Sequence, residues 1–318
     1  MPTLEMTTMI GCPLRCTFCP QDKLRANYSG REFMTLADFQ TIIKKVPRHV
    51  RIDFSGMSEP WVNPACTDML AWILEFSTHP VAIYTTLIGM SPKDEDRVIG
   101  LLSSFHERIE VLCLHLPDAN GNMRGYRQHD NYTARLKKFL RFGDTGVLNK
   151  FEVMTMDHEG HVHHSLSDLL RLGPWHALTR AGNVDSRGIG NQPVETTPQH
   201  DKPVACSFTP FYDQNVVLPN GDVVLCCMDY SSKHKIGNLL HQSYYEMFGA
   251  PELARLRLEN QNFGYNAVTA SLCRSCSRAV TYDLDLAKPQ YWQATSETMF
   301  DFSRHHPDEW FEAHKASD

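Results

Sequence analysis

The chain has 318 residues, of which 42% are hydrophobic and 21% charged, as in an ordinary globular protein with a large core. Its formal net charge of −6 argues against a nucleic-acid partner, because nucleic-acid-binding proteins usually carry a basic field. No apolar run approaches the ~18 residues that a membrane span needs, and the N-terminus lacks the features of a signal peptide. We therefore expect a cytoplasmic protein with no membrane partner.

Strand and helix patterns alternate along the first half of the chain. Repeated β-α units of this length require a parallel sheet with helices outside, so we expect about six units in a partial (β/α)6 barrel of the TIM type. Chemistry in such folds lies at the carboxyl ends of the strands, where we expect Cys12, Glu59, Thr85 and Asp157. The expected strands are 3–10, 50–56, 80–86, 109–116 and 150–156, and the expected helices are 35–46, 65–78, 93–105, 132–142 and 165–173.

The pattern changes near residue 181, where a stretch rich in Gly, Pro, Asn and Thr indicates a linker. Residues 215–227 then predict a β-hairpin with its turn at Pro219-Asn220-Gly221. Residues 243–260 predict a helix that is interrupted near 249–251. We therefore expect two domains, a barrel over 1–190 and a smaller α+β domain over 191–318, which ends in a helix.

Three cysteines, Cys12, Cys16 and Cys19, form the pattern C-x3-C-x2-C directly after the first expected strand. In a reducing compartment, clustered cysteines indicate metal ligation rather than disulfides. Thiolates suit zinc or an iron–sulfur cluster. A zinc site would need a fourth ligand from elsewhere, whereas a 4Fe–4S cluster held by three thiolates would keep one iron open.

The loop with these cysteines and Phe18 resembles the cluster loop of the radical SAM superfamily. The resemblance implies that S-adenosylmethionine binds the open iron and is cleaved to a 5′-deoxyadenosyl radical. A second segment, "FSGMSEP" at 54–60, resembles the Gly-Gly-Glu-Pro-like signature that binds the methionine part of this cofactor, although Met57-Ser58 departs from the double glycine. The cofactor-binding residues that the resemblance implies are Gly56, Ser58, Glu59, Thr85 and Thr86.

A second set of cysteines lies near the end of the chain: Cys206, Cys226 and the C-x2-C pair Cys273 and Cys276. The spacing allows a four-cysteine zinc site. Together with the hairpin, it also resembles the auxiliary-cluster modules called SPASM, or twitch in their short form. No cysteine follows Cys276, so the resemblance implies one auxiliary 4Fe–4S cluster with four protein ligands, as in radical SAM enzymes that modify sugars and aminoglycosides.

Cys227 is adjacent to an expected ligand and should point to the opposite face of its strand. It is either a small buried residue or a hydrogen-atom donor, as in related epimerases, and whether Cys226 or Cys227 is the ligand stays open. We expect core burial for Cys66 and Cys113. The histidines of "HEGHVHHS" (158–165) match no zinc pattern and indicate a polar loop.

The resemblance implies hydrogen abstraction from a carbon of the substrate. We expect a small polar substrate, such as a sugar or aminocyclitol, because no leader-binding domain fits before the cluster loop. Epimerisation with Cys227 as donor is preferred over two-electron dehydrogenation of a carbinol through the auxiliary cluster. Modification of a ribosomal peptide is a third hypothesis, and a zinc-stabilised binding protein without enzymatic activity is a fourth. The expected partner is a one-electron donor such as flavodoxin or ferredoxin.

Overall fold

The computed structural model describes residues 1–155, 160–166, 180–181, 183–184, 198–209, 211–262 and 270–281. Some of the predictions fall on other parts of the chain. Asp157, His158, most of the expected helix at 165–173, the domain boundary at 190 and the C-terminal helix lie outside the described residues.

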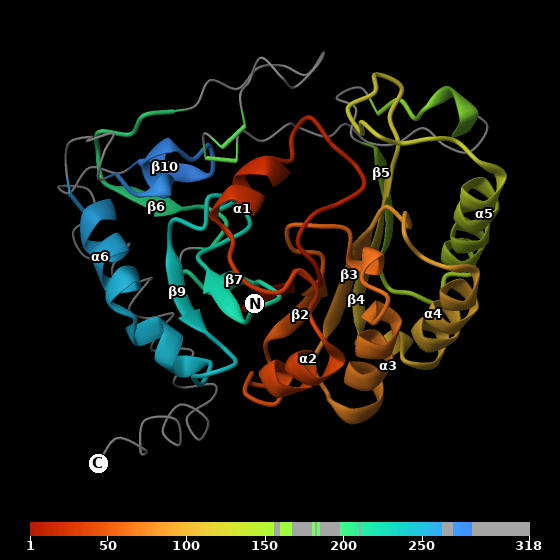
Figure 1. The fold of residues 1–318 in the computed structure, drawn as a ribbon, viewed down its shortest axis with the longest axis horizontal. Coiled ribbons are helices and arrows are strands. Elements are labelled where there is room, and N and C mark those ends of the chain that lie inside the picture. Colours follow the sequence, from red (N-terminus) through yellow and green to blue (C-terminus); the bar gives the residue numbers. More distant parts are fainter. Residues whose placement is uncertain are drawn as a thin grey trace.

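One eight-stranded sheet forms the centre of the described fold, in the order β5-β4-β3-β2-β1-β7-β8-β9 (Figure 1). The strands β1 to β5 are parallel neighbours, as predicted. A sixth parallel strand, β7, comes from the hairpin beyond residue 191 and pairs with β1, so that Glu5 is opposite Val216. The strands are β1 (Thr3–Met6), β2 (Arg51–Phe54), β3 (Val81–Thr85), β4 (Ile109–Leu116), β5 (Phe151–Thr155), β7 (Gln214–Val217), β8 (Asp222–Val224) and β9 (Lys235–Asn238).

Helices follow most of these strands and pack beside one another on the outside of the sheet (Figure 1). The helix predicted over 35–46 begins where Thr35 accepts the backbone N–H of Asp38, a standard N-cap. The short α1 was not predicted. The helices are α1 (Gln21–Asn27), α2 (Leu36–Ile43), α3 (Cys66–Phe76), α4 (Pro92–Ser104), α5 (Asp130–Asp144) and α6 (Pro251–Asn260), with short 3-10 helices at Pro60–Val62, His106–Arg108, His164–Leu166, Tyr245–Gly249 and Leu272–Ser275.

Alternation along the strands separates two environments, because successive side chains point to opposite faces. Leu4, Met6, Ile52 and Phe54 are fully buried in the main core with the helices. Glu5, between Leu4 and Met6, points to the other face. The inner face of the sheet therefore carries Glu5 beside β2, together with an apolar cluster that includes Ala82 and Cys113.

Two cysteines outside the metal-ligand patterns lie in the interior of the fold. Cys66 begins α3, and Cys113 lies in the middle of β4. Both side chains are fully buried. The prediction of core burial for these two residues is therefore confirmed.

A second, two-stranded sheet lies beside α6 (Figure 1). It pairs β6 (Val204–Cys206) with β10 (Ala279–Thr281) in antiparallel register, with Cys206 opposite Ala279. The predicted interruption near 249–251 is confirmed, because a 3-10 helix ends at Gly249 and α6 begins at Pro251. The pairing brings Cys206 next to the C-x2-C segment, which precedes β10.

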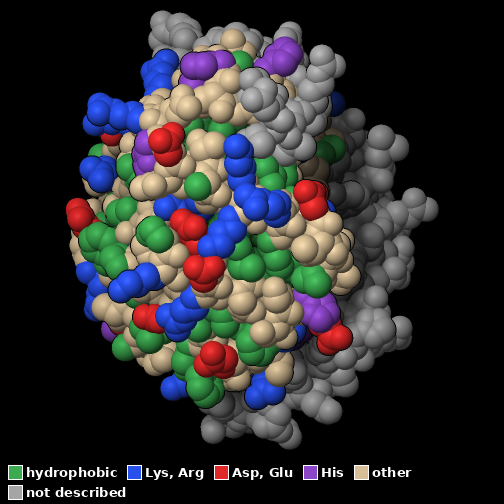
Figure 2. Space-filling model, turned by 90° about the vertical axis from the view of Figure 1, so that its right-hand side faces the viewer, with side chains coloured by type: hydrophobic (Ala, Val, Ile, Leu, Met, Phe, Trp, Pro, Cys, Tyr) green, Lys and Arg blue, Asp and Glu red, His purple; other side chains and the backbone are tan. Residues whose placement is uncertain are grey.

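The face that carries α4 and α5 intersperses Lys and Arg with Asp and Glu side chains (Figure 2). Lys138 of α5 pairs with Asp96 of α4 at 2.6 Å, and Arg97 pairs with Asp68. This face therefore shows no basic field of the kind that binds nucleic acid. In the described part of the chain, no helix is long and apolar enough to cross a membrane.

Candidate active site

The cysteine loop after β1 brings Cys12, Cys16 and Cys19 together. They pack around an apolar group formed by Leu14, Phe18 and Met123. Burial raises the pKa of the Cys12 thiol to about 12, and the nearby charges of Glu59 and Cys19 act in the same direction. Burial and the neighbouring Cys19 and Cys12 also raise the pKa of the Cys16 thiol. Clustered thiols in such an apolar setting suit a soft, positively charged group.

The loop after β2 is seated against the end of β1, beside the cysteines. Gly56 has a φ of +65°, and a Cβ there would lie 2.4 Å from the side-chain oxygen of Thr7. Only glycine fits this position. The same Thr7 oxygen accepts the backbone N–H of Met57 at 3.1 Å. The backbone N–H of Glu59 in turn bonds the Cys12 sulfur. The two expected cofactor motifs therefore form one site.

Glu59 is 3% exposed and joins this loop to the end of β3. Its Oε1 accepts the Thr85 hydroxyl at 2.6 Å and the Trp61 N–H at 3.4 Å. Its Oε2 accepts both the N–H and the hydroxyl of Thr86, each at 2.7 Å. A carboxylate offers about four acceptor positions, and all of them are used here. Three predicted cofactor residues, Glu59, Thr85 and Thr86, thus satisfy one another, and their direct contact with a cofactor stays a prediction.

Other polar atoms near the cysteines are buried and have no hydrogen-bond partner in the described structure. They include the hydroxyl of Ser58, the Oε1 of Gln21 and the hydroxyl of Tyr126. Buried polar atoms without a partner are costly, so these atoms fit a bound group that pairs with them. Ser58 was predicted as a cofactor residue. Gln21 was not, and only its position two residues after Cys19 could have suggested it.

The second cysteine set lines a cavity of about 40 Å³. Burial raises the pKa of the Cys273 thiol, and the neighbouring Cys276 and Cys206 raise it further. Burial likewise raises the pKa of Cys226, with a further contribution from Cys227 and Cys273. The structure therefore brings all four predicted auxiliary ligands together, from β6, the β8 end and the C-x2-C segment. The cavity is lined by Cys206, Phe208, Thr209, Tyr212, Leu225, Cys226, Cys227, Met228, Leu272, Cys273, Cys276, Arg278 and Ala279.

Among the residues that the structure describes, no three His, Cys, Asp or Glu side chains converge as the ligands of one metal ion would. A 4Fe–4S cluster makes a different demand, because each thiolate binds its own iron at a separate corner. Thiols spread around a cavity fit that demand better than they fit a tetrahedral zinc site.

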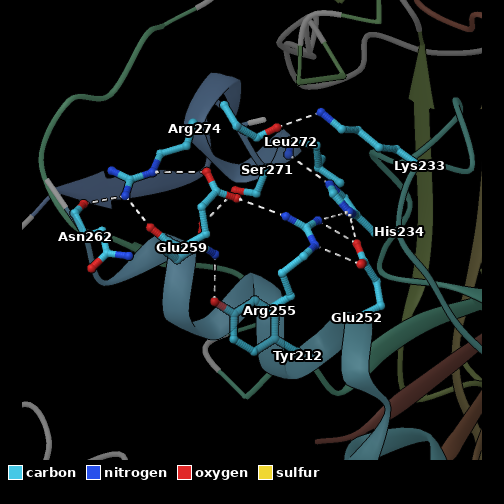
Figure 3. A network of polar contacts seen from close by, with 12 residues as sticks. Tyr212, Lys233, His234, Glu252, Arg255, Glu259, Asn262, Ser271, Leu272 and Arg274 are labelled. Carbon is cyan, nitrogen blue, oxygen red and sulfur yellow. Dashed lines mark hydrogen bonds and ion pairs between the residues drawn. The ribbon is translucent and has the colours of Figure 1, made fainter. Parts of the chain in front are cut away.

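A network of polar contacts holds the C-x2-C segment in place (Figure 3). Arg274, between the two cysteines, is 1% exposed. Its guanidinium donates to the backbone carbonyls of Lys202, Glu259 and Asn262, and to that of His200 at 3.5 Å. One buried cation thus joins the segment before β6, the end of α6 and the cysteine loop.

His234 supports the same segment from the hairpin side (Figure 3). Its Nε2 accepts the backbone N–H of Leu272 at 3.0 Å, and its Nδ1 lies 2.7 Å from Glu252 of α6. Complete burial lowers the pKa of His234. The ring is therefore neutral, with its proton on Nδ1 donated to Glu252.

Replacing Arg274 by alanine should lower the free energy of unfolding by about 3 kcal/mol, because several buried carbonyls lose their donor. Iron bound at the C-terminal site should fall as well. Urea unfolding and iron analysis under anaerobic conditions measure both. Arg141→Ala is the matched control, since Arg141 is an exposed arginine of α5 that does not line the cavity. Equal stability of the two variants would contradict a role for Arg274 in holding the segment.

Cys227 lies between the auxiliary cavity and the inner face of the main sheet. Its thiol donates a hydrogen bond to the Glu5 carboxylate, and the Arg180 guanidinium and Tyr230 are close to it. Burial raises the pKa of Cys227 to about 12 and that of Glu5 to about 7. Sequence reasoning missed Glu5, Arg180 and Tyr230. An acidic residue inside an otherwise apolar strand was the available signal for Glu5.

The family model of the SPASM iron–sulfur cluster-binding domain matches residues 206–277. Residues 206–277 are therefore similar to a SPASM domain. The match begins at the first predicted auxiliary ligand and ends one residue after the last. The matched segment contains every residue that lines the cavity except Arg278 and Ala279. The iron–sulfur cluster that this model describes agrees with the predicted 4Fe–4S cofactor. No curated protein matches the sequence.

Solved structures share the fold over most of the chain. One is BtrN in complex with AdoMet and 2-DOIA, at 17% identity and a TM-score of 0.56, covering 87% of this chain and 93% of BtrN. Another is anSMEcpe with bound AdoMet, at 14% identity and a TM-score of 0.51, covering 88% and 86%. A third is anSMEcpe with AdoMet and the Cp18Cys peptide, at 14% and 0.50, covering 87% and 89%. The chain therefore has the partial-barrel fold of radical SAM enzymes with a SPASM-type domain, as predicted.

Proposed function

We propose that this protein is a radical SAM enzyme with two 4Fe–4S clusters that epimerises a carbon of a small polar substrate, such as a sugar or aminocyclitol. The observation that carries the proposal is the difference between the two cysteine sites. Three thiols gather beside buried polar atoms without partners, whereas four thiols surround a cavity inside the SPASM domain. Three thiolates would leave one iron of a cluster open for S-adenosylmethionine, whereas four would ligate a second cluster fully. Radical chemistry with an auxiliary cluster needs one site of each kind.

Cys12, Cys16 and Cys19 would hold the open cluster, and Cys206, Cys226, Cys273 and Cys276 the auxiliary one. When bound, the open cluster and S-adenosylmethionine supply a 5′-deoxyadenosyl radical that removes a hydrogen atom from the substrate. Gly56 and Ser58 shape the cofactor side of this site, and Glu59, Thr85 and Thr86 keep the loops around it in place. BtrN and anSMEcpe, which share the fold, are both seen with AdoMet.

The inner face of the sheet supports a small polar substrate. Glu5 and Arg180 bring one negative and one positive group to the same region, and the Arg180 Nε has no hydrogen-bond partner there. Burial lowers the pKa of His115 in this region to about 4, so its ring is neutral at pH 7. Hydroxyl and amino groups of a sugar or aminocyclitol can bond to such a set.

Cys227 supports epimerisation. A hydrogen-atom donor must carry its S–H hydrogen, and the raised pKa of Cys227 keeps the thiol protonated at neutral pH. Its position between the SPASM cavity and Glu5 allows it to face a substrate on the inner side of the sheet. Donation of the hydrogen atom from the face opposite to abstraction would invert the carbon and leave a thiyl radical on Cys227. One electron from the reduced flavodoxin or ferredoxin and one proton from water would then restore the thiol.

Turnover in heavy water tests the proposal directly. We expect one deuterium in the product, with no net oxidation, because the thiol hydrogen exchanges with solvent. A product two mass units lighter and without deuterium would instead show dehydrogenation. Sugars and aminocyclitols are the substrates to try first, with reduced flavodoxin or ferredoxin as the electron donor.

Dehydrogenation of a carbinol is the second candidate, and Glu5 is the observation in its favour. Oxidation of a hydroxyl-bearing carbon radical requires a base for the hydroxyl proton. Burial raises the pKa of Glu5 to about 7, which is well matched to that task. The SPASM domain would then accept the electron.

Metal analysis separates these enzymes from a zinc-stabilised binding protein. Anaerobically prepared protein should contain about eight iron atoms with matching sulfide, as two 4Fe–4S clusters require. Stoichiometric zinc in a colourless protein would overturn the proposed function. Ribosomal-peptide modification would be shown by turnover of a peptide rather than a sugar; anSMEcpe has been seen with a peptide.

A further inference from the structure

A tyrosine of the SPASM domain reaches the N-terminal cysteine loop. The phenol oxygen of Tyr230 lies 3.4 Å from the sulfur of Cys19, although 211 positions separate the two residues in the chain. Tyr230 is 3% exposed. Its ring packs with Leu24 of α1 and Val216 of β7 in an apolar group that also includes Cys19. The buried phenol therefore meets Cys19, which is partly buried, within an apolar part of the core.

The direction of this hydrogen bond follows from the state of the sulfur. A cysteine that binds iron is a thiolate and has no hydrogen to donate. The phenol must then be the donor, with Cys19 as the acceptor. The Nε2 of Gln21 lies 3.3 Å from the same sulfur, so Cys19 has two side-chain donors, one from each domain.

Hydrogen bonds to cluster sulfurs are among the factors that set the reduction potential of iron–sulfur clusters. Reduction adds negative charge to the cluster and its thiolates. A donor aimed at a thiolate stabilises this charge, most strongly where water is excluded. Removing the donor should make the cluster harder to reduce.

We propose that Tyr230 is a positioning residue of the SPASM domain that raises the reduction potential of the N-terminal cluster through its hydrogen bond to Cys19. The inference rests on the proposed function, because it requires a cluster on Cys12, Cys16 and Cys19. Tyr230 follows Cys226 and Cys227 in one tight turn, in which Asp229 N–H bonds the Cys226 carbonyl at 3.0 Å. The same turn thereby contacts both cysteine sites.

The test is a redox titration of the anaerobically reconstituted holoenzyme, followed by electron paramagnetic resonance. The signal that changes on addition of S-adenosylmethionine reports the N-terminal cluster. In Tyr230→Phe, its potential should shift to a lower value, while the other cluster's potential and the iron content stay as in wild type. Tyr28→Phe is the matched control, since Tyr28 packs on the same apolar group but donates to the Arg31 carbonyl.

An unchanged potential in Tyr230→Phe overturns the inference. Loss of the N-terminal cluster from this variant also overturns it, because it would assign Tyr230 to packing and not to tuning. A measurement on the wild type needs no variant: resonance Raman bands of the iron–cysteine bonds should shift in heavy water, and invariant bands would exclude the hydrogen bond. If wild-type protein binds no cluster that responds to S-adenosylmethionine, the proposed function itself fails.

Discussion

Cys227→Ala should abolish formation of the epimer while cleavage of S-adenosylmethionine continues. The variant lacks the S–H hydrogen that returns to the substrate, but Cys12, Cys16 and Cys19 remain in place. The substrate radical should then be released as an oxidised or shunt product. Chromatography of 5′-deoxyadenosine and mass spectrometry of the product in heavy water measure both outcomes.

Two controls make this result specific to Cys227. Cys66→Ala removes a thiol that is buried at the start of α3, and it should keep epimerase activity. Cys226→Ala should lose about four iron atoms, whereas Cys227→Ala should keep them. If Cys227→Ala loses that iron instead, Cys227 is the ligand. Undiminished epimer from an iron-replete Cys227→Ala would place the hydrogen donor elsewhere.

Glu59→Ala should lower the free energy of unfolding by about 3 kcal/mol, because the Thr86 N–H and two hydroxyls lose a charged acceptor in a buried place. Urea unfolding of the anaerobic protein measures the change. The substitution also frees the end of β3 from the loop after β2. We therefore expect weaker binding of S-adenosylmethionine, because the loop after β2 is no longer held to the end of β3.

Glu75→Ala is the control for this prediction, since Glu75 is an exposed acid near the end of α3 and should change stability by less than about 0.5 kcal/mol. A Glu59→Ala protein as stable as this control would contradict the role of Glu59 in joining the loop after β2 to the end of β3. If stability is retained but binding of S-adenosylmethionine is lost, Glu59 contacts the cofactor directly, as its motif suggests.

Local spacing was sufficient for much of the fold and for the metal chemistry. The pattern C-x3-C-x2-C needs only one loop, and its three thiols lie together for that reason. The alternation of strands and helices predicted β1 to β5 as parallel neighbours, since each β-α unit is itself local. It predicted about six such units, but the sixth parallel strand, β7, comes from the hairpin. The α1 helix escaped prediction because its seven residues carry too little periodicity. The pairing of β7 with β1 also escaped prediction, because strand pairing across about 200 positions has no local signal.

The sequence by itself determined which side chains can do chemistry: seven predicted thiolate ligands, Cys227 beside one of them, and the β-α order that places loops at the strand ends. Only the tertiary structure decided how these groups are used. In the folded protein, the Glu59 carboxylate accepts hydrogen bonds from Thr85 and Thr86, and the Cys227 thiol donates one to Glu5. The tertiary structure also brings Tyr230 to Cys19. Hydrogen-bond partners and burial arise from packing between distant segments, and residue spacing alone does not encode them.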